Sequence, residues 1–197
     1  GTAARFLTAY LGMSEGVYVL NASSQMKKRP MKELLDALVE LGAKIDYLEE
    51  EGTFPFRITG IGYQQLEKIH SPRQVDLNID RSSQFLSALL MTAPLRFDSL
   101  TIHLTGTRAA RSYVYMTEKM MKQFGHPGVR KLFSMLSRPI PEVLNIDEKQ
   151  VQQMPQLSMD EVIERVKSQM DTGDYYRVLS APYHAQDYTI EPDISAA

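Results

Sequence analysis

Three consecutive polar residues, Ser82, Ser83 and Gln84, stand where an apolar helical pattern begins. The N-terminus of a helix offers unpaired backbone N–H groups and a partial positive charge, so it binds phosphate without a full charge nearby. The two hydroxyls add donors, and the amide both donates and accepts hydrogen bonds. This helix start therefore suits a phosphorylated polyol. The alternative is that Ser82 is an N-cap that serves only the fold.

Two arginines, Arg5 and Arg29, are each expected in the first turn of a helix. A cation at that position opposes the helix dipole and costs on the order of 0.3 kcal/mol unless an anion lies close by. The planar guanidinium suits two-point contact with a carboxylate or a phosphate, so the pair could share one small anion. The alternative is that one or both arginines are solvated or bind a main-chain carbonyl.

A third helix start carries Arg111 and Tyr113. The ordinary interpretation is a surface arginine and a half-buried tyrosine. Their place in the repeat described next favours a role in binding.

The elements that must position these residues recur along the chain. The first half is expected to contain helices over residues 5–11 (ended by Gly12) and 29–42, where Pro30 takes the first helical position and Gly42 forms a left-handed C-cap, with strands over 17–20, 44–48 and 56–59. The second half is expected to contain helices over 82–95 and 111–124 and strands over 75–79, 100–104, 175–179 and 188–190.

This recurrence predicts an α+β fold made of repeated βαβαββ units, the first of them incomplete. The whole of 1–197 is expected to be one domain, with an inserted helical segment over about 127–172 and the start of a crossover to a second domain at about 190–197. Ser158 and Glu161 fit a capping box for the inserted helix. A helix packed on the domain surface is favoured over a lid or a partner-binding helix.

Composition excludes several classes of site. The chain has 197 residues, 43% of them hydrophobic, which is enough for a sizeable core, and a formal net charge of -2 gives no broad field for nucleic acid or acidic membranes. It has no cysteine and four histidines without ligand spacing, so neither a disulfide nor a metal site is expected. No apolar run approaches a membrane span, which favours a cytoplasmic protein. The absence of an initial methionine suggests a piece of a longer protein.

Four segments resemble the 5-enolpyruvylshikimate-3-phosphate synthases. They are Gly-Thr-Ala-Ala-Arg at 1–5, Lys-Arg-Pro at 28–30 with the helix to 43, Ser-Ser-Gln-Phe-Leu-Ser-Ala-Leu-Leu-Met at 82–91, and Glu-Pro-Asp-Ile-Ser-Ala-Ala at 191–197. The resemblance covers most of 1–126 and 174–197, and the 82–91 segment is its most specific part.

The resemblance implies transfer of the enolpyruvyl group of phosphoenolpyruvate to the 5-hydroxyl of shikimate 3-phosphate, a step of the shikimate pathway toward chorismate and the aromatic amino acids, with no metal or organic cofactor. It implies two groups of binding residues: Ser82, Ser83, Gln84, Arg111 and Tyr113 for shikimate 3-phosphate, and Gly1, Arg5 and Arg29 for phosphoenolpyruvate.

Two departures from the family pattern stand out. Ala110 replaces a serine that commonly contacts the substrate phosphate three residues before the tyrosine, and Arg111 is the candidate replacement donor. The family's acid–base groups belong to segments that are not in this sequence. No catalytic residue is therefore expected here, and the isolated chain is expected to be inactive without the second domain of the same enzyme.

Two other functions stay open. A related transferase acts on UDP-N-acetylglucosamine, but it usually carries a loop cysteine, which this chain lacks. A non-catalytic binding module, in which the inserted segment recruits a partner, is the alternative from another class.

Overall fold

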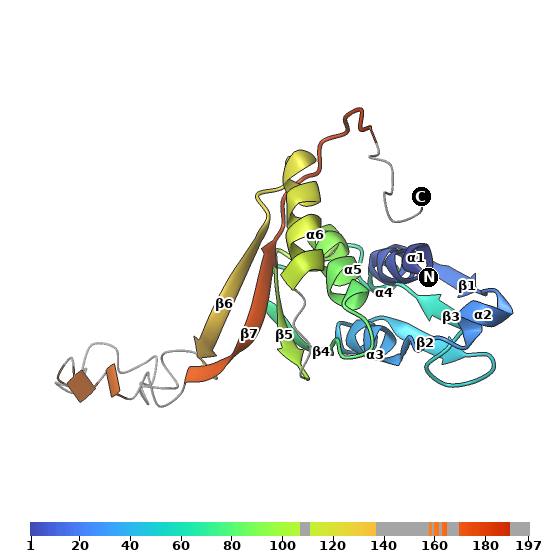
Figure 1. Ribbon diagram of the computed structural model, residues 1–197, viewed down its shortest axis with the longest axis horizontal. Coiled ribbons are helices and arrows are strands. Elements are labelled where there is room, and N and C mark those ends of the chain that lie inside the picture. Colours follow the sequence, from blue (N-terminus) through green and yellow to red (C-terminus); the bar gives the residue numbers. More distant parts are fainter. Residues whose placement is uncertain (107–110, 137–157, 159, 162, 165–169, 190–197) are drawn as a thin grey trace.

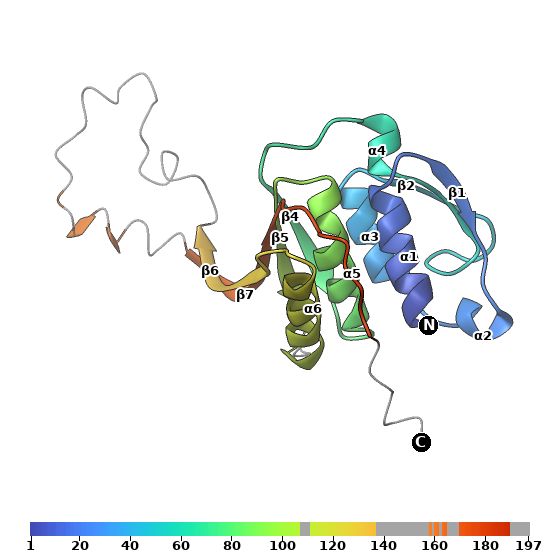
Figure 2. The same ribbon diagram turned by 90° about the horizontal axis from the view of Figure 1, so that it is seen from above.

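Two β-sheets enclose a layer of helices in the computed structural model of the chain (Figure 1). The structure describes residues 1–106, 111–136, 158, 160–161, 163–164 and 170–189. Seen from above, helices α1 and α3 cover one sheet, and α5 and α6 cover the other (Figure 2). Helix and sheet are thus mixed, as the α+β prediction requires.

The first sheet has three strands in the order β1-β3-β2, and both outer strands run antiparallel to β3. The elements of this half are α1 (Thr2–Met13), β1 (Val17–Leu20), α2 (Ser24–Lys27), α3 (Lys32–Glu40), β2 (Lys44–Tyr47), β3 (Phe56–Thr59) and α4 (Ile61–Gln64).

The second sheet has four strands in the order β4-β5-β7-β6. Strand β4 is parallel to β5, whereas β7 is antiparallel to both of its neighbours. The elements are β4 (Arg73–Asn78), α5 (Gln84–Thr92), a 3-10 turn (Ala93–Leu95), β5 (Ser99–Thr105), α6 (Arg111–Gln123), β6 (Val129–Leu136) and β7 (Met170–Leu179). Because β4, β5 and β6 run in the same direction, the helices that connect them, α5 and α6, run parallel to each other.

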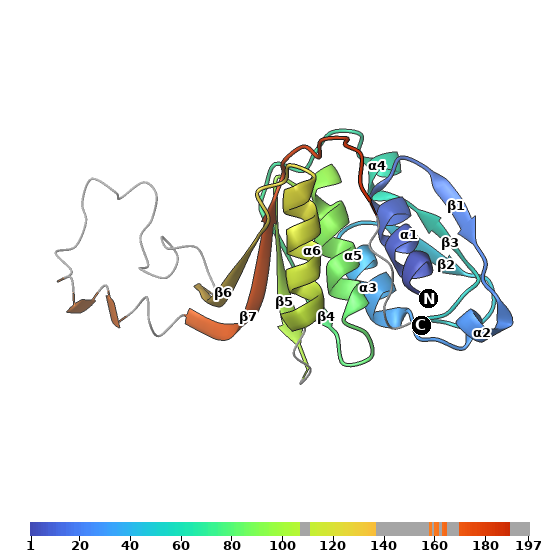
Figure 3. The ribbon, with the colours of Figure 1, turned by 45° about the horizontal axis from the view of Figure 1, so that its top comes forward.

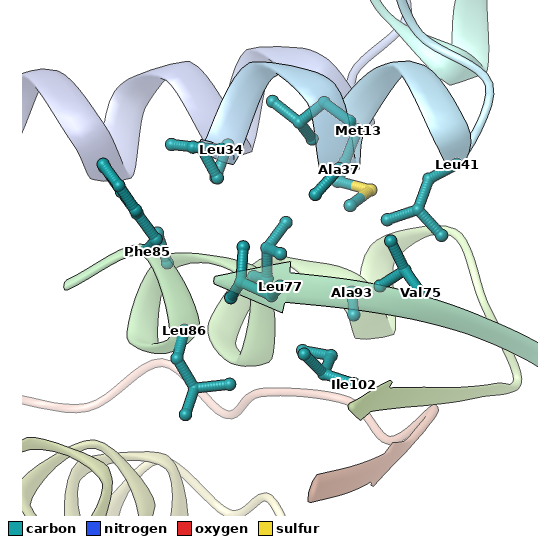
Figure 4. Close-up of a cluster of buried hydrophobic side chains, with 14 of the residues drawn as sticks. Met13, Leu34, Ala37, Leu41, Val75, Leu77, Phe85, Leu86, Ala93 and Ile102 are labelled. Atoms are coloured by element: carbon teal, nitrogen blue, oxygen red, sulfur yellow. The ribbon is translucent and has the colours of Figure 1, made fainter. Parts of the chain in front are cut away.

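The core lies where the helices of the two halves meet. Leucines at helical spacing bury one face of α3, and Leu34, Leu35 and Leu38 are fully covered. Phe85 and Leu77 approach this face from the second half (Figure 4). Burial of such side chains contributes roughly 1.5–3 kcal/mol each, which holds the two halves as one body.

The C-cap predicted at Gly42 is confirmed. Gly42 has a φ of 114°, its N–H donates to the Val39 carbonyl, and the N–H of Ala43 donates to the Leu38 carbonyl at 2.9 Å. These two bonds close α3 in a Schellman motif.

Two predicted helix boundaries are wrong. Helix α1 does not stop at Gly12 but continues to Met13, because this glycine serves close packing: a Cβ there would lie 2.8 Å from Leu38 Cδ2. Helix α3 begins at Lys32, so Pro30 precedes it and Arg29 lies in the loop after α2. The dipole argument made for Arg29 therefore does not apply.

The strand predicted over 188–190 is also wrong. The described part of that segment has no strand, and the Tyr188 ring lies beside that of Phe124, with centroids 5.9 Å apart. The fourth strand of this sheet is instead β6, which pairs with β7. The adjacent cations Arg130 and Lys131 interrupt the alternation of apolar and polar residues that would have predicted this strand. Charged residues are common on edge strands, and Lys131 pairs with Asp174 of β7 at 2.8 Å.

Both ends of the segment predicted as an insertion therefore lie in the sheet, and most of what lies between them is outside the described residues. The capping box is present: Ser158 N donates to Glu161 Oε2 at 2.8 Å, and Glu161 N donates to Ser158 Oγ at 3.3 Å. Met170, which lies within the segment predicted as an insertion, begins β7.

Candidate functional site

Helices α1 and α5 are joined at their N-terminal ends. Arg5 Nη1 donates to Gln84 Oε1 at 2.6 Å, and Gln84 Nε2 donates to Thr2 Oγ1 at 2.8 Å. Figure 3 shows that the starts of α1, α5 and α6 lie at the same edge of the molecule. The fold thereby brings Thr2 and Arg5 into contact with Gln84, although about eighty residues separate them in sequence.

Arg5 is the buried cation of this edge. Its side chain is 7% exposed, packs 5.5 Å from the centroid of the Phe85 ring, and leaves Nε without a hydrogen-bond partner. Burial, and then the nearby charge of Arg29, lower the pKa of the Arg5 guanidinium. An arginine nevertheless stays protonated in proteins, so the site keeps a desolvated positive charge.

Gly1 lies between the two arginines. A Cβ on Gly1 would lie 3.2 Å from Arg29 Nη1 and 3.7 Å from Arg5 Nη1. Within the part of the chain that the structure describes, neither arginine forms an ion pair with a carboxylate. The predicted trio therefore converges, and its like charges favour an anion between them.

The two serines differ in what they do. Ser82 Oγ accepts a hydrogen bond from the Gln84 backbone N at 3.3 Å, but Ser82 lies one residue before the N-cap of α5, so the N-cap alternative is wrong in position. Ser83 occupies the N-cap position of α5, yet its side chain makes no capping bond, and the residue is only 6% exposed. The Ser83 hydroxyl is thus not used to cap the helix.

Tyr113 lies at the same edge. Helices α5 and α6 are held together by a hydrogen bond of 2.7 Å between Ser87 Oγ and Thr117 Oγ1. Since the helices are parallel, Tyr113 and Ser83, each four residues earlier, both lie one turn closer to the shared end. Tyr113 is exposed, with 50% of its surface accessible, so the expectation of a half-buried tyrosine is wrong. Arg111 begins α6, but its side chain, like all of Ala110, lies outside the described residues.

Thr2 is the residue that sequence reasoning missed. It is the first residue of α1, and its spacing gives no sign of a bond to a residue of another helix.

No group of three or more histidine or acidic side chains that could hold a metal ion occurs in the described ranges. None of the helices described there has the length and apolar character that crossing a membrane requires.

Comparison with known proteins decides the family. Residues 1–130 match the family described as EPSP synthase (3-phosphoshikimate 1-carboxyvinyltransferase). The chain belongs to the EPSP synthase family. All eight residues of the two predicted groups lie within the matched stretch.

Relatives in the EPSP synthase family share about two fifths of the aligned residues. The 3-phosphoshikimate 1-carboxyvinyltransferase of Bacteroides fragilis is 41% identical over 125 residues, which are 64% of this chain and 29% of that protein. The enzyme of the same name from a Sulfurovum species is 44% identical over 125 residues, 64% of this chain and 28% of that protein. This chain thus spans less than a third of the length of these relatives.

A solved structure of EPSP synthase from Acinetobacter baumannii is 30% identical, with a TM-score of 0.49, over 66% of this chain and 26% of that one.

Proposed function

We propose that this chain is part of the shikimate-3-phosphate-binding domain of an enzyme that transfers the enolpyruvyl group of phosphoenolpyruvate to the 5-hydroxyl of shikimate 3-phosphate. The family match supports the reaction. The observation that carries the assignment is the junction of Arg5 and Gln84, which joins an anion site at α1 to the polar start of α5.

The two groups of residues have different roles in this proposal. Gly1, Arg5 and Arg29 hold phosphoenolpyruvate, whose carboxylate and phosphate neutralise the two converging guanidinium groups. The group around α5 holds shikimate 3-phosphate through hydroxyl and amide donors; it consists of Ser82, Ser83, Gln84 and Tyr113, with Arg111 at the start of α6. The junction keeps the two substrates side by side, so that the 5-hydroxyl faces the enolpyruvyl carbon.

The chemistry itself needs more than this chain. Bond formation at the enolpyruvyl carbon releases phosphate, and the proton transfers require acid–base groups that we assign to the second domain. Closure of that domain over the helix starts would exclude water and align the reactants. The rest of the same enzyme is therefore the expected partner, the cytoplasm the expected location, and no cofactor is invoked.

We also propose that the two sheets are copies of one βαβαββ unit, the first without its leading strand. The order β1-β3-β2 repeats as β5-β7-β6 with the same strand directions, and α1 and α3 take the places of α5 and α6. Residues 1–197 would then form one domain, with the inserted segment between β6 and β7 and the crossover near its end.

Calorimetric titration of the chain with shikimate 3-phosphate tests the proposal. We expect binding to the wild-type chain, and a loss of about 1 kcal/mol or more in Ser83→Ala and in Gln84→Ala, because each removes a bond to a charged ligand. Ser71→Ala is the matched control, since Ser71 precedes the opposite end of β4. Unchanged affinity in both site variants would remove these residues from the site.

Two further measurements separate the alternatives. UDP-N-acetylglucosamine should not displace shikimate 3-phosphate from the chain. The isolated chain should release no phosphate from the two substrates together, and measurable release would refute the assignment of the acid–base groups to the second domain.

A further inference from the structure

Both ends of the Gln84 carboxamide are held by helix α1. Arg5 Nη1 donates to Oε1 at 2.6 Å, and Nε2 donates to Thr2 Oγ1 at 2.8 Å. A guanidinium has only donors, so the atom of Gln84 that faces Arg5 must be its oxygen. The nitrogen must then face Thr2, and the chemistry of the neighbours fixes which way the amide is turned.

We propose that Thr2 is a positioning residue that acts on the ligand through Gln84. Its hydroxyl accepts one amide hydrogen and so prevents rotation of the carboxamide about its last side-chain bond. As a β-branched residue in the first turn of α1, Thr2 has few accessible rotamers, so its hydroxyl is a stiff support. This inference rests on the proposed function, which makes Gln84 a substrate-binding residue.

The Gln84 carboxamide can still form two further hydrogen bonds when it is held in this way. Once Thr2 has taken one N–H and Arg5 one lone pair, Gln84 keeps one donor and one acceptor. One donor together with one acceptor suits a hydroxyl group, which both donates and accepts. We therefore expect Gln84 to bind a hydroxyl of the phosphorylated ring. The helix starts and Ser83 would bind the phosphate.

Thr2 is not needed for the core in this arrangement. It is exposed, whereas Thr8, on the same helix, is fully buried and donates to the Ala4 carbonyl at 2.8 Å. The two threonines thus offer a matched comparison between a hydroxyl that holds Gln84 and one that bonds only within its own helix.

The test uses the full chain with Thr2→Val, which keeps the shape but loses the hydroxyl, and Thr2→Ser, which keeps the hydroxyl. Calorimetry with shikimate 3-phosphate should show roughly 3- to 10-fold weaker binding for Thr2→Val, as expected for one lost hydrogen bond, and near wild-type binding for Thr2→Ser. Thr8→Val should not change the affinity.

NMR of the Gln84 side-chain amide tests the positioning role directly. The amide shifts should change only if Thr2 holds the carboxamide, and not if Thr2 merely supports the fold. The chemical shifts of the two Nε2 protons of Gln84 should differ from those of free glutamine in the wild-type chain and in Thr8→Val. In Thr2→Val they should move toward the values of free glutamine. Wild-type affinity in Thr2→Val, or Thr2→Ser as weak as Thr2→Val, would overturn the inference. If the wild-type chain binds no shikimate 3-phosphate, the proposed function fails instead, and unchanged amide shifts in Thr2→Val would then refute the positioning role separately.

Discussion

Arg96 Nε donates a hydrogen bond of 2.6 Å to the main-chain carbonyl of Met13, the last residue of α1. The same guanidinium reaches the Leu66 carbonyl at 2.8 Å and the Glu15 carboxylate at 2.9 Å. Arg96 is only 7% exposed. A residue of the second half thus satisfies a carbonyl that the end of a helix in the first half leaves unpaired.

Replacing Arg96 should therefore destabilise the whole fold. Arg96→Met leaves two main-chain carbonyls without these donors, and we expect the free energy of unfolding to fall by about 2–4 kcal/mol. Urea denaturation gives the value. Arg57→Met is the control, because Arg57 is exposed and lies 3.9 Å from its partner Asp46, so its loss should cost about 0.5 kcal/mol or less. Equal effects of the two variants would contradict this role.

The hydroxyl pair between α5 and α6 predicts non-additive behaviour. Ser87 and Thr117 are buried and share a hydrogen bond, and Thr117 Oγ1 also donates to the Tyr113 carbonyl at 2.8 Å. Ser87→Ala leaves Thr117 only the Tyr113 carbonyl, and Thr117→Val leaves the buried Ser87 hydroxyl without this bond, so each single variant should cost roughly 1–2 kcal/mol. The double variant should be more stable than the sum of the singles implies. Additive losses in a double-mutant cycle would refute the coupling.

Local elements could be predicted from the sequence because their signals lie within a few residues. The apolar spacing of α3, the glycine at 42 and the strand over 56–59 depend on neighbours along the chain, and all three are confirmed. Gly12 shows the limit of this reasoning. Its role depends on Leu38 of another helix, so the same residue type that ends α3 lies inside α1.

The sequence predicted the residue types of the candidate site but not the contacts between those residues. Arg5 and Gln84 lie at helix starts as predicted, whereas Arg29 lies in a loop, and the convergence of Gly1, Arg5 and Arg29 follows from packing that no spacing rule contains. The bond from Gln84 to Thr2 joins residues 82 positions apart, so only the fold reveals it. Strand β6 was missed for a different reason, since charged residues on an edge strand hide its alternation.

Tyr183 predicts a specific alkaline transition. Its hydroxyl donates to the Met91 carbonyl at 3.0 Å, and burial raises the pKa of Tyr183 from 10.0 to about 12. Between these values the unfolded chain loses the phenolic proton while the folded chain keeps it, so this group's contribution to stability is complete below pH 10 and is lost as pH rises to about 12.

Ultraviolet titration of tyrosinate checks this transition. The difference between the wild-type chain and Tyr183→Phe should have its midpoint near pH 12, and Tyr183→Phe should lose stability less steeply above pH 10. A difference curve centred near pH 10 would show that the phenol is not shielded by the folded chain.

Gln84→Glu should separate stability from binding. The new carboxylate would face the Arg5 guanidinium, which is buried and has no acidic partner in the described structure, so the free energy of unfolding should rise by about 0.5–1 kcal/mol. The same charge repels an incoming phosphate, so affinity for shikimate 3-phosphate should fall roughly tenfold or more. Gln84→Met, which is uncharged, should lose affinity and stability together.

Urea denaturation measures the stability of these variants, and calorimetry measures their affinity for shikimate 3-phosphate. If Gln84→Glu were less stable than the wild-type chain, Arg5 would not be an uncompensated cation, and the proposed phosphoenolpyruvate site would lose its main electrostatic support.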